Sequence, residues 1–380
     1  MKYKEEILQM LFKAYFDARK HKRSKQSQVT FEVNLEQNIF DLYEEIISKT
    51  YTPGTSICFI INQPIKREIF AATFRDRVVH HFIYNIVSPL AEKMFLHDVY
   101  SCRKEKGTLF GIDRAYSKMQ SCSENFTKKT FVLKLDIAGY FMNMNKDKLY
   151  SKVEQLINKN ELFLPIQSNL LKYLISQNIY HDPTIDCKFQ SQKSEWKNLP
   201  KNKSLFGTAT NCGLPIGNLT SQLYGNLYLN EFDHFIKKEL KINHYGRYVD
   251  DIYMFHQDKN KLIAQITNIK RRLLLTEKLQ LHPKKIYFQE INKGFPFLGV
   301  YLLPYRRYIG NRIKAGLYKT INNLLNGIFE SIDTELEKLQ SYTSLLKHHS
   351  CKKLLKHINL LATYALSKQN YHSYNFSLIH

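Results

Sequence analysis

This sequence of 380 residues lacks several features that define other classes of protein. No apolar run approaches the ~18 residues that a membrane-spanning helix needs, so we expect no membrane partner. The first ten residues, MKYKEEILQM, carry charges inside their apolar pattern, which is not the pattern of a secretory signal. There is also no internal repeat and no low-complexity segment.

Cysteine is scarce, and none of the six cysteines forms a CxxC pair. This scarcity argues against a disulfide framework or a zinc site and predicts reduced thiols in a cytoplasmic protein. Three histidines accompany one cysteine in a basic segment near the C-terminus, but their spacing fits no zinc site, so we predict a solvated helix face there. These four residues are His348, His349, Cys351 and His357.

Acidic residues are few beside the basic ones: 34 Asp and Glu face 56 Lys and Arg, a formal net charge of +22. Such an excess indicates a polyanionic partner. Aromatic residues, 13% of the chain, are interleaved with the basic ones and favour nucleic acid over a membrane surface. With 43% hydrophobic residues the chain has enough apolar surface to fold, which excludes disordered and collagen-like proteins, and its length predicts roughly two or three domains.

Hydrophobic periodicity predicts a chain of mixed helices and strands. The basic segment 19–25 is either a solvated helix end or a phosphate-binding patch. Residues 176–212 are polar and contain prolines, which predicts an irregular insertion. Helices are predicted at 3–20, near 35–50, at about 75–96, 221–240 and 258–280, and from 317 onward; strands are predicted at 57–61, 66–70 and 130–136, with a hairpin at 247–255.

Three aspartates lie at predicted strand ends: Asp136 closes one strand, and Asp250 and Asp251 form the tip of the hairpin. Adjacent like charges repel, so a doublet in an apolar setting is costly unless a cation neutralises it. Hard oxygen ligands on a rigid sheet suit Mg²⁺, and two such ions would activate a hydroxyl and stabilise a departing pyrophosphate. An Asp-Asp pair alone is usually a simple turn, but the strand residues on both sides of this pair favour the metal site.

Seven segments resemble, in chain order, the motifs of reverse transcriptases. They are 67–69 (REI) and 74–81 (FRDRVVHH) of the fingers, the first palm carboxylate motif 135–141 (LDIAGYF), the template-gripping motif 213–222 (GLPIGNLTSQ), the catalytic box 248–251 (YVDD), the next motif 281–285 (LHPKK) and the primer grip 297–299 (FLG). Seven motifs in the order of the family are strong evidence where one would be weak.

Two dipeptides point to a subclass of that family. Most reverse transcriptases carry Gln-Gly and Ser-Pro in the template-gripping motif, whereas this chain has Ile216-Gly217 and Ser221-Gln222. In this respect it resembles the reverse transcriptases of diversity-generating retroelements. Three further segments are similar to that subclass: 182–184 (DPT), 203–206 (KSLF) and 304–307 (PYRR).

The resemblance implies a role for each carboxylate. Asp136 and Asp250 would bind two Mg²⁺ ions, with Mn²⁺ as an alternative cation, while Asp251 adjusts the pair and the carbonyl of Ile137 adds a ligand. Lys285 would protonate the pyrophosphate leaving group, a general-acid role for which Lys284 is the alternative.

The resemblance also implies residues that bind nucleotide. Arg67, Arg75 and Arg77 would contact the incoming triphosphate through their forked guanidinium groups, although arginines on a helix surface are the alternative. Phe141 occupies the position of the steric gate of the family, where a bulky ring collides with a 2′-hydroxyl; Tyr140 is the next candidate.

Template and primer contacts follow from the two grip motifs. Gly217 lacks a Cβ and so permits close approach of the backbone to a template base. The residues expected to contact template or primer are Ile216, Gly217, Ser221, Gln222, Phe297, Leu298 and Gly299.

The fold implied is α+β, a right-hand polymerase with fingers, an antiparallel-sheet palm and a helical thumb. N-terminal helices and fingers would occupy residues 1–128, the palm 129–303 with its fingers-like insertion at about 176–212, and the thumb 304–380. The thumb segment contains 11 Lys and Arg but 4 Asp and Glu, as suits a surface that grips an RNA–DNA duplex.

The implied function is that of an RNA-directed DNA polymerase, a nucleotidyltransferase that makes cDNA from a template-repeat RNA with errors at adenines. Its partners would be the RNA template, a DNA or RNA primer, dNTPs and an oligomer of a small basic accessory protein, the variability determinant. The alternatives are a bacterial reverse transcriptase of phage-defence or retron type and a non-catalytic RNA-binding protein on a polymerase scaffold. A group II intron maturase and an RNase H domain are not expected, because only about 80 residues follow the primer grip and they contain no second carboxylate cluster.

Overall fold

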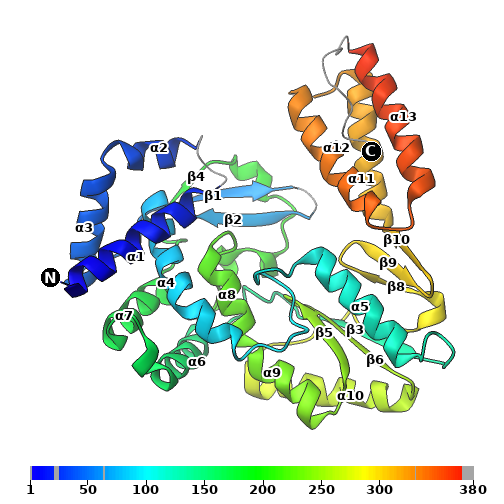
Figure 1. Cartoon of the computed structure of the whole chain (residues 1–380), viewed down its shortest axis with the longest axis horizontal. Coiled ribbons are helices and arrows are strands. Elements are labelled where there is room, and N and C mark those ends of the chain that lie inside the picture. Colours follow the sequence, from blue (N-terminus) through cyan, green and yellow to red (C-terminus); the bar gives the residue numbers. More distant parts are fainter. Residues whose placement is uncertain (1, 21–24, 63–64, 330, 370–380) are drawn as a thin grey trace. The chain divides into compact units, whose positions relative to one another are not determined.

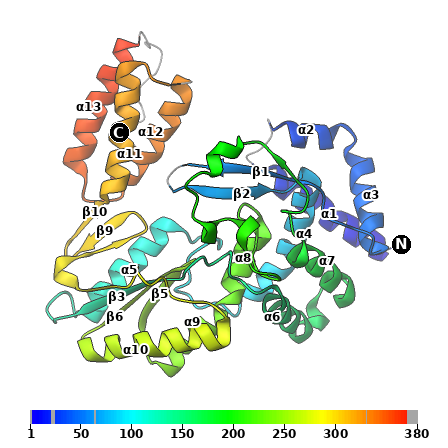
Figure 2. The same ribbon diagram turned by 180° about the vertical axis from the view of Figure 1, so that it is seen from behind.

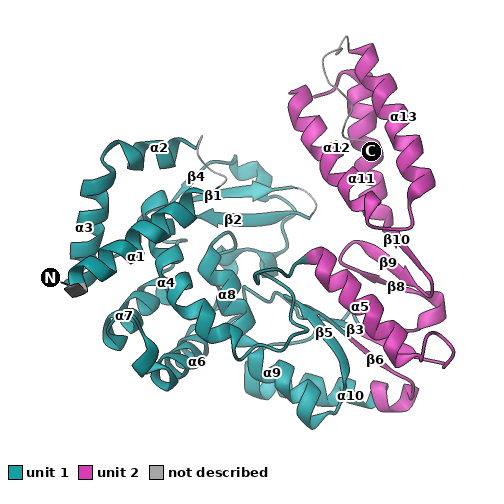
Figure 3. Cartoon of the chain, in the orientation of Figure 1, with its two compact units in different colours: residues 1–107, 134–253, 263–286 teal, residues 108–133, 254–262, 287–380 magenta. Residues whose placement is uncertain are grey.

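The computed structural model describes residues 2–20, 25–62, 65–329 and 331–369. Over these residues the chain divides into two compact units, shown in two colours in Figure 3. The first unit comprises residues 1–107, 134–253 and 263–286, and the second comprises 108–133, 254–262 and 287–380. No helix in the described part of the chain is both long enough and apolar enough to cross a membrane.

Helices make up most of the ordered structure (Figure 1). They are α1 (Lys2–Arg19), α2 (Gln26–Val33), α3 (Leu35–Ile47), α4 (Phe74–Glu92), α5 (Thr108–Cys122), α6 (Lys146–Lys159), α7 (Ser168–Tyr180), α8 (Leu219–Tyr228), α9 (Asn230–His234), α10 (Lys259–Arg272), α11 (Asn311–Asn326), α12 (Ile332–Lys347) and α13 (Lys352–Lys368).

The strands form three sheets, with the orders β2-β1-β4, β10-β9-β8 and β5-β6-β3-β7. Their bounds are β1 (Ser56–Ile61), β2 (Arg67–Ala71), β3 (Phe131–Asp136), β4 (Cys187–Phe189), β5 (His244–Tyr248), β6 (Asp251–His256), β7 (Tyr287–Glu290), β8 (Phe295–Phe297), β9 (Val300–Leu303) and β10 (Arg306–Ile309). The mixture of helices and antiparallel strands confirms the expected α+β fold.

Helix α4 anchors the N-terminal part of the first unit. Thr73 caps its N-terminus: the Thr73 side chain accepts a hydrogen bond from the main-chain amide of Asp76 at 3.1 Å, which satisfies a free amide of the first turn. The buried carboxylate of Asp76 also accepts from the Tyr51 hydroxyl at 2.9 Å and the Gly54 amide at 3.0 Å. These bonds fix the segment 51–54 against α4, while α1 packs along the same helix (Figures 1 and 2).

In the second unit, α11, α12 and α13 lie side by side in both views (Figures 1 and 2). Their interior is an apolar cluster that includes Leu317, Ile321 and Leu324 of α11. Helix α11 ends where Gly327 adopts a left-handed conformation with φ of 66°, which glycine tolerates without strain. The helical stripe predicted from residue 317 is therefore confirmed only as far as Asn326, where it lies in the core of a three-helix bundle; Ile328 lies beyond the helix end and is exposed.

Most predicted elements are found within a few residues of their expected ends, but two long helices are shorter than predicted. The prediction of one helix over 221–240 is wrong: α8 ends at Tyr228, α9 follows, and a π-helical turn then ends at Glu239. The helix predicted over 258–280 likewise ends at Arg272 before a π-helical turn. The insertion at 176–212 is mostly irregular as expected, but it also contributes β4.

The predicted solvated face near the C-terminus is also wrong in part. His348, His349 and Ser350 connect α12 to α13 instead of lying within one helix, and His349 and Cys351 are buried. Within the basic segment 19–25, residues 21–24 lie outside the described residues. The predicted boundaries of fingers, palm and thumb stay a prediction.

Candidate active site

The three predicted aspartates belong to the first unit and meet at one site. Asp136 is the last residue of β3, Asp250 lies in the turn between β5 and β6, and Asp251 begins β6. Burial raises the pKa of Asp250 to about 6, and the charges of Asp136 and Asp251 contribute to this rise against the opposing effect of Lys285. Strands β3 and β6 are neighbours in the sheet, and Lys134 of β3 contacts Asp251 of β6, so the ends of these strands bring the aspartates to one region.

Two lysines balance this negative charge. Lys285 Nζ lies 2.9 Å from Asp136 Oδ2, and Lys134 Nζ lies 3.1 Å from Asp251 Oδ1. The amide of His282 donates to the carbonyl of Asp136 at 2.8 Å and so holds the predicted motif 281–285 against the end of β3. Sequence analysis missed Lys134, although its position two residues before Asp136 on a strand places both side chains on one face.

The donor set fits a hard divalent cation. Carboxylate oxygens are the ligands that Mg²⁺ prefers, and a cation would relieve the repulsion that adds to the effect of burial on the pKa of Asp250. Among the described residues, no group of three or more His, Cys, Asp and Glu side chains is drawn together tightly enough to form a metal cluster. Lys134 and Lys285 instead contact two of the three carboxylates, so a bound cation would replace lysine contacts.

The turn that carries Asp250 has a strained backbone. Val249 has a φ of 56°, a left-handed conformation that is unfavourable for a β-branched residue and persists only where its surroundings hold it. The Val249 amide donates to Ser101 Oγ at 3.1 Å, and Arg247 Nη1 donates to the Val249 carbonyl at 2.9 Å. The turn is thus fixed from both sides.

A buried ion pair supports this turn. Arg247 and Asp233 are both fully buried, with Nε–Oδ1 and Nη2–Oδ2 distances of 2.7 Å. Burial lowers the pKa of Arg247, but the charge and hydrogen bonds of Asp233 outweigh burial and raise that pKa above its ordinary value. The Tyr245 hydroxyl also donates to Asp233. Sequence analysis missed this pair; the signal was an arginine directly before the catalytic box, within a predicted strand of the hairpin.

Gly246 permits a close approach that no other residue could make. A Cβ at this position would lie 2.4 Å from the Tyr253 hydroxyl and 2.6 Å from the Tyr100 hydroxyl, and these two hydroxyls are themselves 2.7 Å apart. The main chain of Tyr100 also donates to the carbonyl of Arg247 at 3.0 Å. The segment around Tyr100 therefore packs directly against β5.

The two adjacent rings of the first palm motif have different environments. Tyr140 is 3% exposed, and its hydroxyl donates to the carbonyl of Gly225 in α8. Phe141 is partly exposed, and its ring atoms lie 3.4 and 3.5 Å from the place where a Cβ on Gly225 would stand. Of the two steric-gate candidates, only Phe141 is therefore partly exposed.

The template-gripping motif is tied to the β1–β2 sheet. The Phe70 amide donates to the carbonyl of Ile216 at 3.0 Å, and a Cβ on Gly217 would lie 2.9 Å from Ile69 Cγ2. Gly217 has a φ of +125°, so both its conformation and its surroundings require glycine. Ile216 packs against an apolar cluster; Ser221 is buried and Gln222 exposed on α8.

The three predicted nucleotide-binding arginines are placed differently. Arg67 is exposed at the start of β2, and burial lowers the pKa of the partly buried Arg77. Arg75 forms ion pairs with Glu45 and Asp76, and its guanidinium lies 4.9 Å from the Tyr51 ring centre. Arg75 thus contacts the N-terminal segment in this structure.

The predicted primer grip belongs to the second unit. Phe297 is buried in β8, while Leu298 and Gly299 have φ values of 48° and 84° in the turn that follows. A Cβ on Gly299 would lie 2.5 Å from Ile313 Cδ1, so the turn packs against the start of α11.

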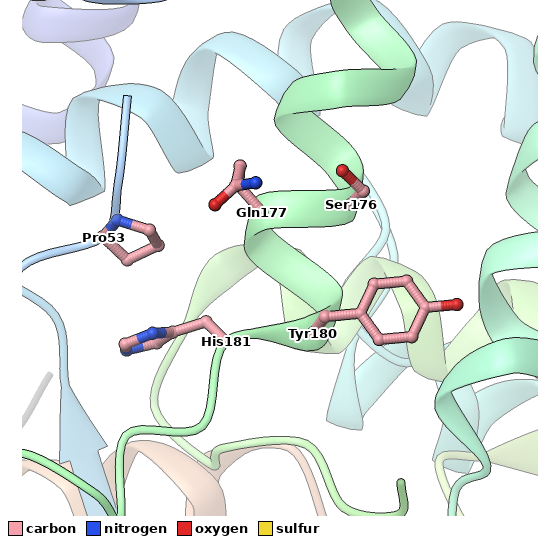
Figure 4. Close-up of a pocket in the computed structure, with 5 residues that line it drawn as sticks. All are labelled: Pro53, Ser176, Gln177, Tyr180 and His181. Atoms are coloured by element: carbon pink, nitrogen blue, oxygen red, sulfur yellow. The ribbon is translucent and has the colours of Figure 1, made fainter. Parts of the chain in front are cut away.

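A separate pocket in the first unit does not fit a nucleotide. It is lined by Pro53, Ser176, Gln177, Tyr180 and His181 (Figure 4). Burial raises the pKa of Tyr180 to about 12 and lowers that of His181, so the lining residues carry no charge at neutral pH. A phosphate group would find no cation among them.

Comparison with known proteins identifies the family. Residues 65–302, more than half of the chain, match the family described as Reverse transcriptase (RNA-dependent DNA polymerase). The chain therefore belongs to the reverse transcriptase family. That family consists of RNA-directed DNA polymerases, a class of nucleotidyltransferases that use divalent metal ions, so the predicted enzyme class is confirmed.

No curated protein matches the chain. Among solved structures, telomerase from Candida albicans in complex with a TWJ fragment of telomeric RNA has 12% identity and a TM-score of 0.49, covering 90% of this chain and 60% of that one. Apo telomerase from Candida tropicalis, truncated from its C-terminal domain, has 12% identity and a TM-score of 0.48, covering 71% of this chain and 59% of that one. This chain thus spans about 60% of the length of the first of these structures.

Proposed function

We propose that this chain copies RNA into DNA at the site formed by Asp136, Asp250 and Asp251. The observation that carries the proposal is the electrostatic coupling of these carboxylates within a chain of the reverse transcriptase family. The substrates would be an RNA template, a DNA or RNA primer and dNTPs.

In this proposal the three aspartates and the carbonyl of Ile137 hold two Mg²⁺ ions, or Mn²⁺ in their place. When bound, the ions supply the charge that activates the primer 3′-hydroxyl and stabilises the departing pyrophosphate. The side chain of Lys285 is 52% exposed and lies within hydrogen-bond reach of Asp136. It is therefore positioned to hold a proton beside the carboxylates and to donate it to the leaving pyrophosphate.

Nucleotide recognition would involve Arg67, Arg75, Arg77 and Phe141. The arginines supply positive charge for the triphosphate, and Arg75 would exchange its Glu45 contact for a phosphate. Phe141 would exclude a 2′-hydroxyl. Its partial exposure supports this role, because the neighbouring Tyr140 is buried with its hydroxyl bound.

Template and primer would be held by the two grip motifs. Ile216, Gly217, Ser221 and Gln222 are the proposed template contacts. The proposed primer contacts are Phe297, Leu298 and Gly299.

We further propose that the template is a template-repeat RNA of a diversity-generating retroelement, copied with errors at adenines together with a small basic accessory protein oligomer. The support is Ile216, which packs in an apolar cluster and cannot hydrogen-bond near the template base as a glutamine could. A site that contacts a base only by packing discriminates between bases by ~1–3 kcal/mol. A site that also hydrogen-bonds the base discriminates more strongly.

The test is deep sequencing of cDNA copied from a defined RNA, with the accessory protein present. We expect errors concentrated at template adenines, and we expect Ile216→Gln to lower them more than errors at other bases. Ile216→Val is the matched control, since it keeps an apolar side chain and should preserve the adenine bias.

Each contrary outcome has a distinct meaning. An unbiased wild-type error spectrum would remove the diversity-generating assignment and favour an enzyme of phage-defence or retron type. A protein that binds RNA but synthesises no DNA would be a non-catalytic scaffold, which contradicts the proposed activity itself.

A further inference from the structure

Residues 181–212 form a loop that is bound along the β1–β2 sheet of the first unit. Strand β4 within this loop runs parallel to β1, with Cys187 opposite Ser56. Beyond the strand, the Gln190 amide donates to the carbonyl of Cys58 at 2.9 Å. The rings of Phe189 and Phe206 stack with centres 5.8 Å apart. The loop is therefore packed against the sheet as part of the folded unit.

One buried carboxylate holds the second half of this loop. Glu68 of β2 is 1% exposed and accepts hydrogen bonds from Trp196 Nε1 at 2.6 Å, Ser204 Oγ at 2.8 Å and the Leu205 amide at 2.6 Å. A buried carboxylate is stable when its oxygens accept hydrogen bonds in this way. Two of the donors come from the segment 203–206 (KSLF), so this segment attaches the second half of the loop to β2.

The anchored loop reaches the first carboxylate motif. The carbonyl of Asn202 would lie 3.0 Å from a Cβ on Gly139, which stands three residues after Asp136 and has a φ of +52°. Leu205 joins the same apolar cluster as Phe141 and Ile216. The 3₁₀ turn Lys201–Lys203 therefore lies directly against the loop between the first metal-binding carboxylate and the proposed steric gate.

Two lysines flank Asn202 in this turn. Lys201 is exposed and Lys203 is partly exposed. Within the described residues, neither forms an ion pair with a carboxylate. Their charge is thus available beside the loop that must border a bound nucleotide, whose phosphates are strongly negative.

We propose that Lys201 and Lys203 bind the phosphates of the incoming nucleotide, and that Glu68 is the positioning residue that holds them there. This inference rests on the proposed polymerase function. The two lysines of the insertion would then bind phosphate together with the arginines of the fingers motifs.

The test is steady-state single-nucleotide extension with the full chain. For the double variant Lys201→Ala/Lys203→Ala we expect KM for the dNTP to rise about tenfold, kcat to stay within about twofold, and inhibition by pyrophosphate to weaken in parallel. Affinity for the RNA–DNA duplex should not change. Lys188→Ala/Lys193→Ala, which removes two exposed lysines from the same insertion, is the matched control and should leave KM unchanged.

Glu68→Gln tests the positioning role. A glutamine amide nitrogen would face one of the three donors, so the turn should loosen and KM should rise. Because the same lysines act in both cases, the effects of Glu68→Gln and of the double lysine variant should not add. If Glu68→Gln does not fold, as thermal unfolding would reveal, Trp196→Phe removes one donor and serves in its place.

An unchanged KM in the double lysine variant would overturn the inference while leaving the polymerase assignment intact. Weaker duplex binding with an unchanged KM would also overturn it, because the lysines would then contact the nucleic-acid backbone. Additive effects would refute the role of Glu68. Absence of extension by the wild-type chain would instead contradict the proposed function.

Discussion

The turn that carries Asp250 and the bundle of α11, α12 and α13 are held together by opposite means. The turn rests on directional polar contacts, among them the fully buried pair Arg247–Asp233 and the hydroxyl of Ser101. The bundle rests on an apolar cluster of side chains such as Leu324. Polar networks specify one arrangement, whereas apolar cores tolerate substitutions that keep their volume. We infer that the turn holds the carboxylates in fixed positions. We infer that the bundle instead provides an outer surface for contact with the nucleic-acid duplex.

The largest effect should come from breaking the buried pair. Arg247→Met leaves the buried carboxylate of Asp233 without its ionic partner and with only the Tyr245 hydroxyl donating to it, so we expect the unfolding free energy to fall by about 3–5 kcal/mol and DNA synthesis to be lost. Denaturant unfolding and primer extension measure the two effects. Arg247→Met/Asp233→Leu should regain much of the stability but not the activity, because the Val249 carbonyl still lacks its donor. Recovery of full activity in the double variant would show that the network is only structural.

The corresponding change in the bundle should cost stability without affecting chemistry. Leu324→Ala removes a fully buried side chain and should lower the unfolding free energy by about 2–5 kcal/mol through the cavity it leaves. Under conditions where the protein stays folded, single-turnover extension from saturating duplex should match the wild type. A loss of rate as large as that of Arg247→Met would remove the proposed difference between the two regions.

Replacing the ring of Phe141 should alter sugar selection. Phe141→Ala opens space beside the nucleotide sugar, and we expect discrimination between dNTP and NTP to fall by about 10- to 200-fold. Tyr140→Phe is the matched control, since it removes only a buried hydroxyl and should leave discrimination unchanged. Competitive incorporation of dNTP and NTP measures both. Unchanged discrimination in an active Phe141→Ala enzyme would exclude Phe141 as the gate.

The smallest effect should come from the exposed lysines of α13. Lys352, Lys353 and Lys356 are exposed, and replacing them with glutamine should reduce the slope of log K against log salt by ~0.9 for each phosphate that is no longer neutralised. Salt titration of duplex binding measures the slope. Lys338→Gln is the control, because Lys338 already pairs with Glu335 and its replacement should change the slope little. Equal slopes for all variants would mean that α13 does not contact phosphates.

Sequence patterns predicted the parts of this molecule that depend on local order. The strand that ends at Asp136, the hairpin around Asp250 and the stripe of α11 follow from periodicity and turn chemistry within a few residues. The long-range contacts could not be predicted in this way. Glu68 meets Trp196 across 128 positions, and the two ends of such a contact leave no periodic signal in either segment.

The environments of His349 and Arg75 also depend on tertiary packing and not on their neighbours in the sequence. The basic segment near His349 has the composition of a solvated helix, yet a chain reversal between α12 and α13 buries that side chain. Arg75 lies in a fingers motif, but only the fold places Glu45 of α3 beside it. In both cases tertiary packing decides an environment that the neighbouring residues leave open.

The most direct test of the account measures single-turnover extension and duplex affinity side by side in three proteins. These are the wild type, Asp250→Asn and the triple glutamine variant of α13. We expect Asp250→Asn to lose rate by about a thousandfold while keeping its duplex affinity within about twofold, because a metal-binding carboxylate acts on the chemical step. The α13 variant should bind duplex more weakly and extend at the wild-type rate once saturated. Substantial extension by Asp250→Asn would contradict this account. So would a parallel loss of rate and affinity in both variants, because the account assigns the chemical step to the aspartates and duplex binding to the lysines of α13.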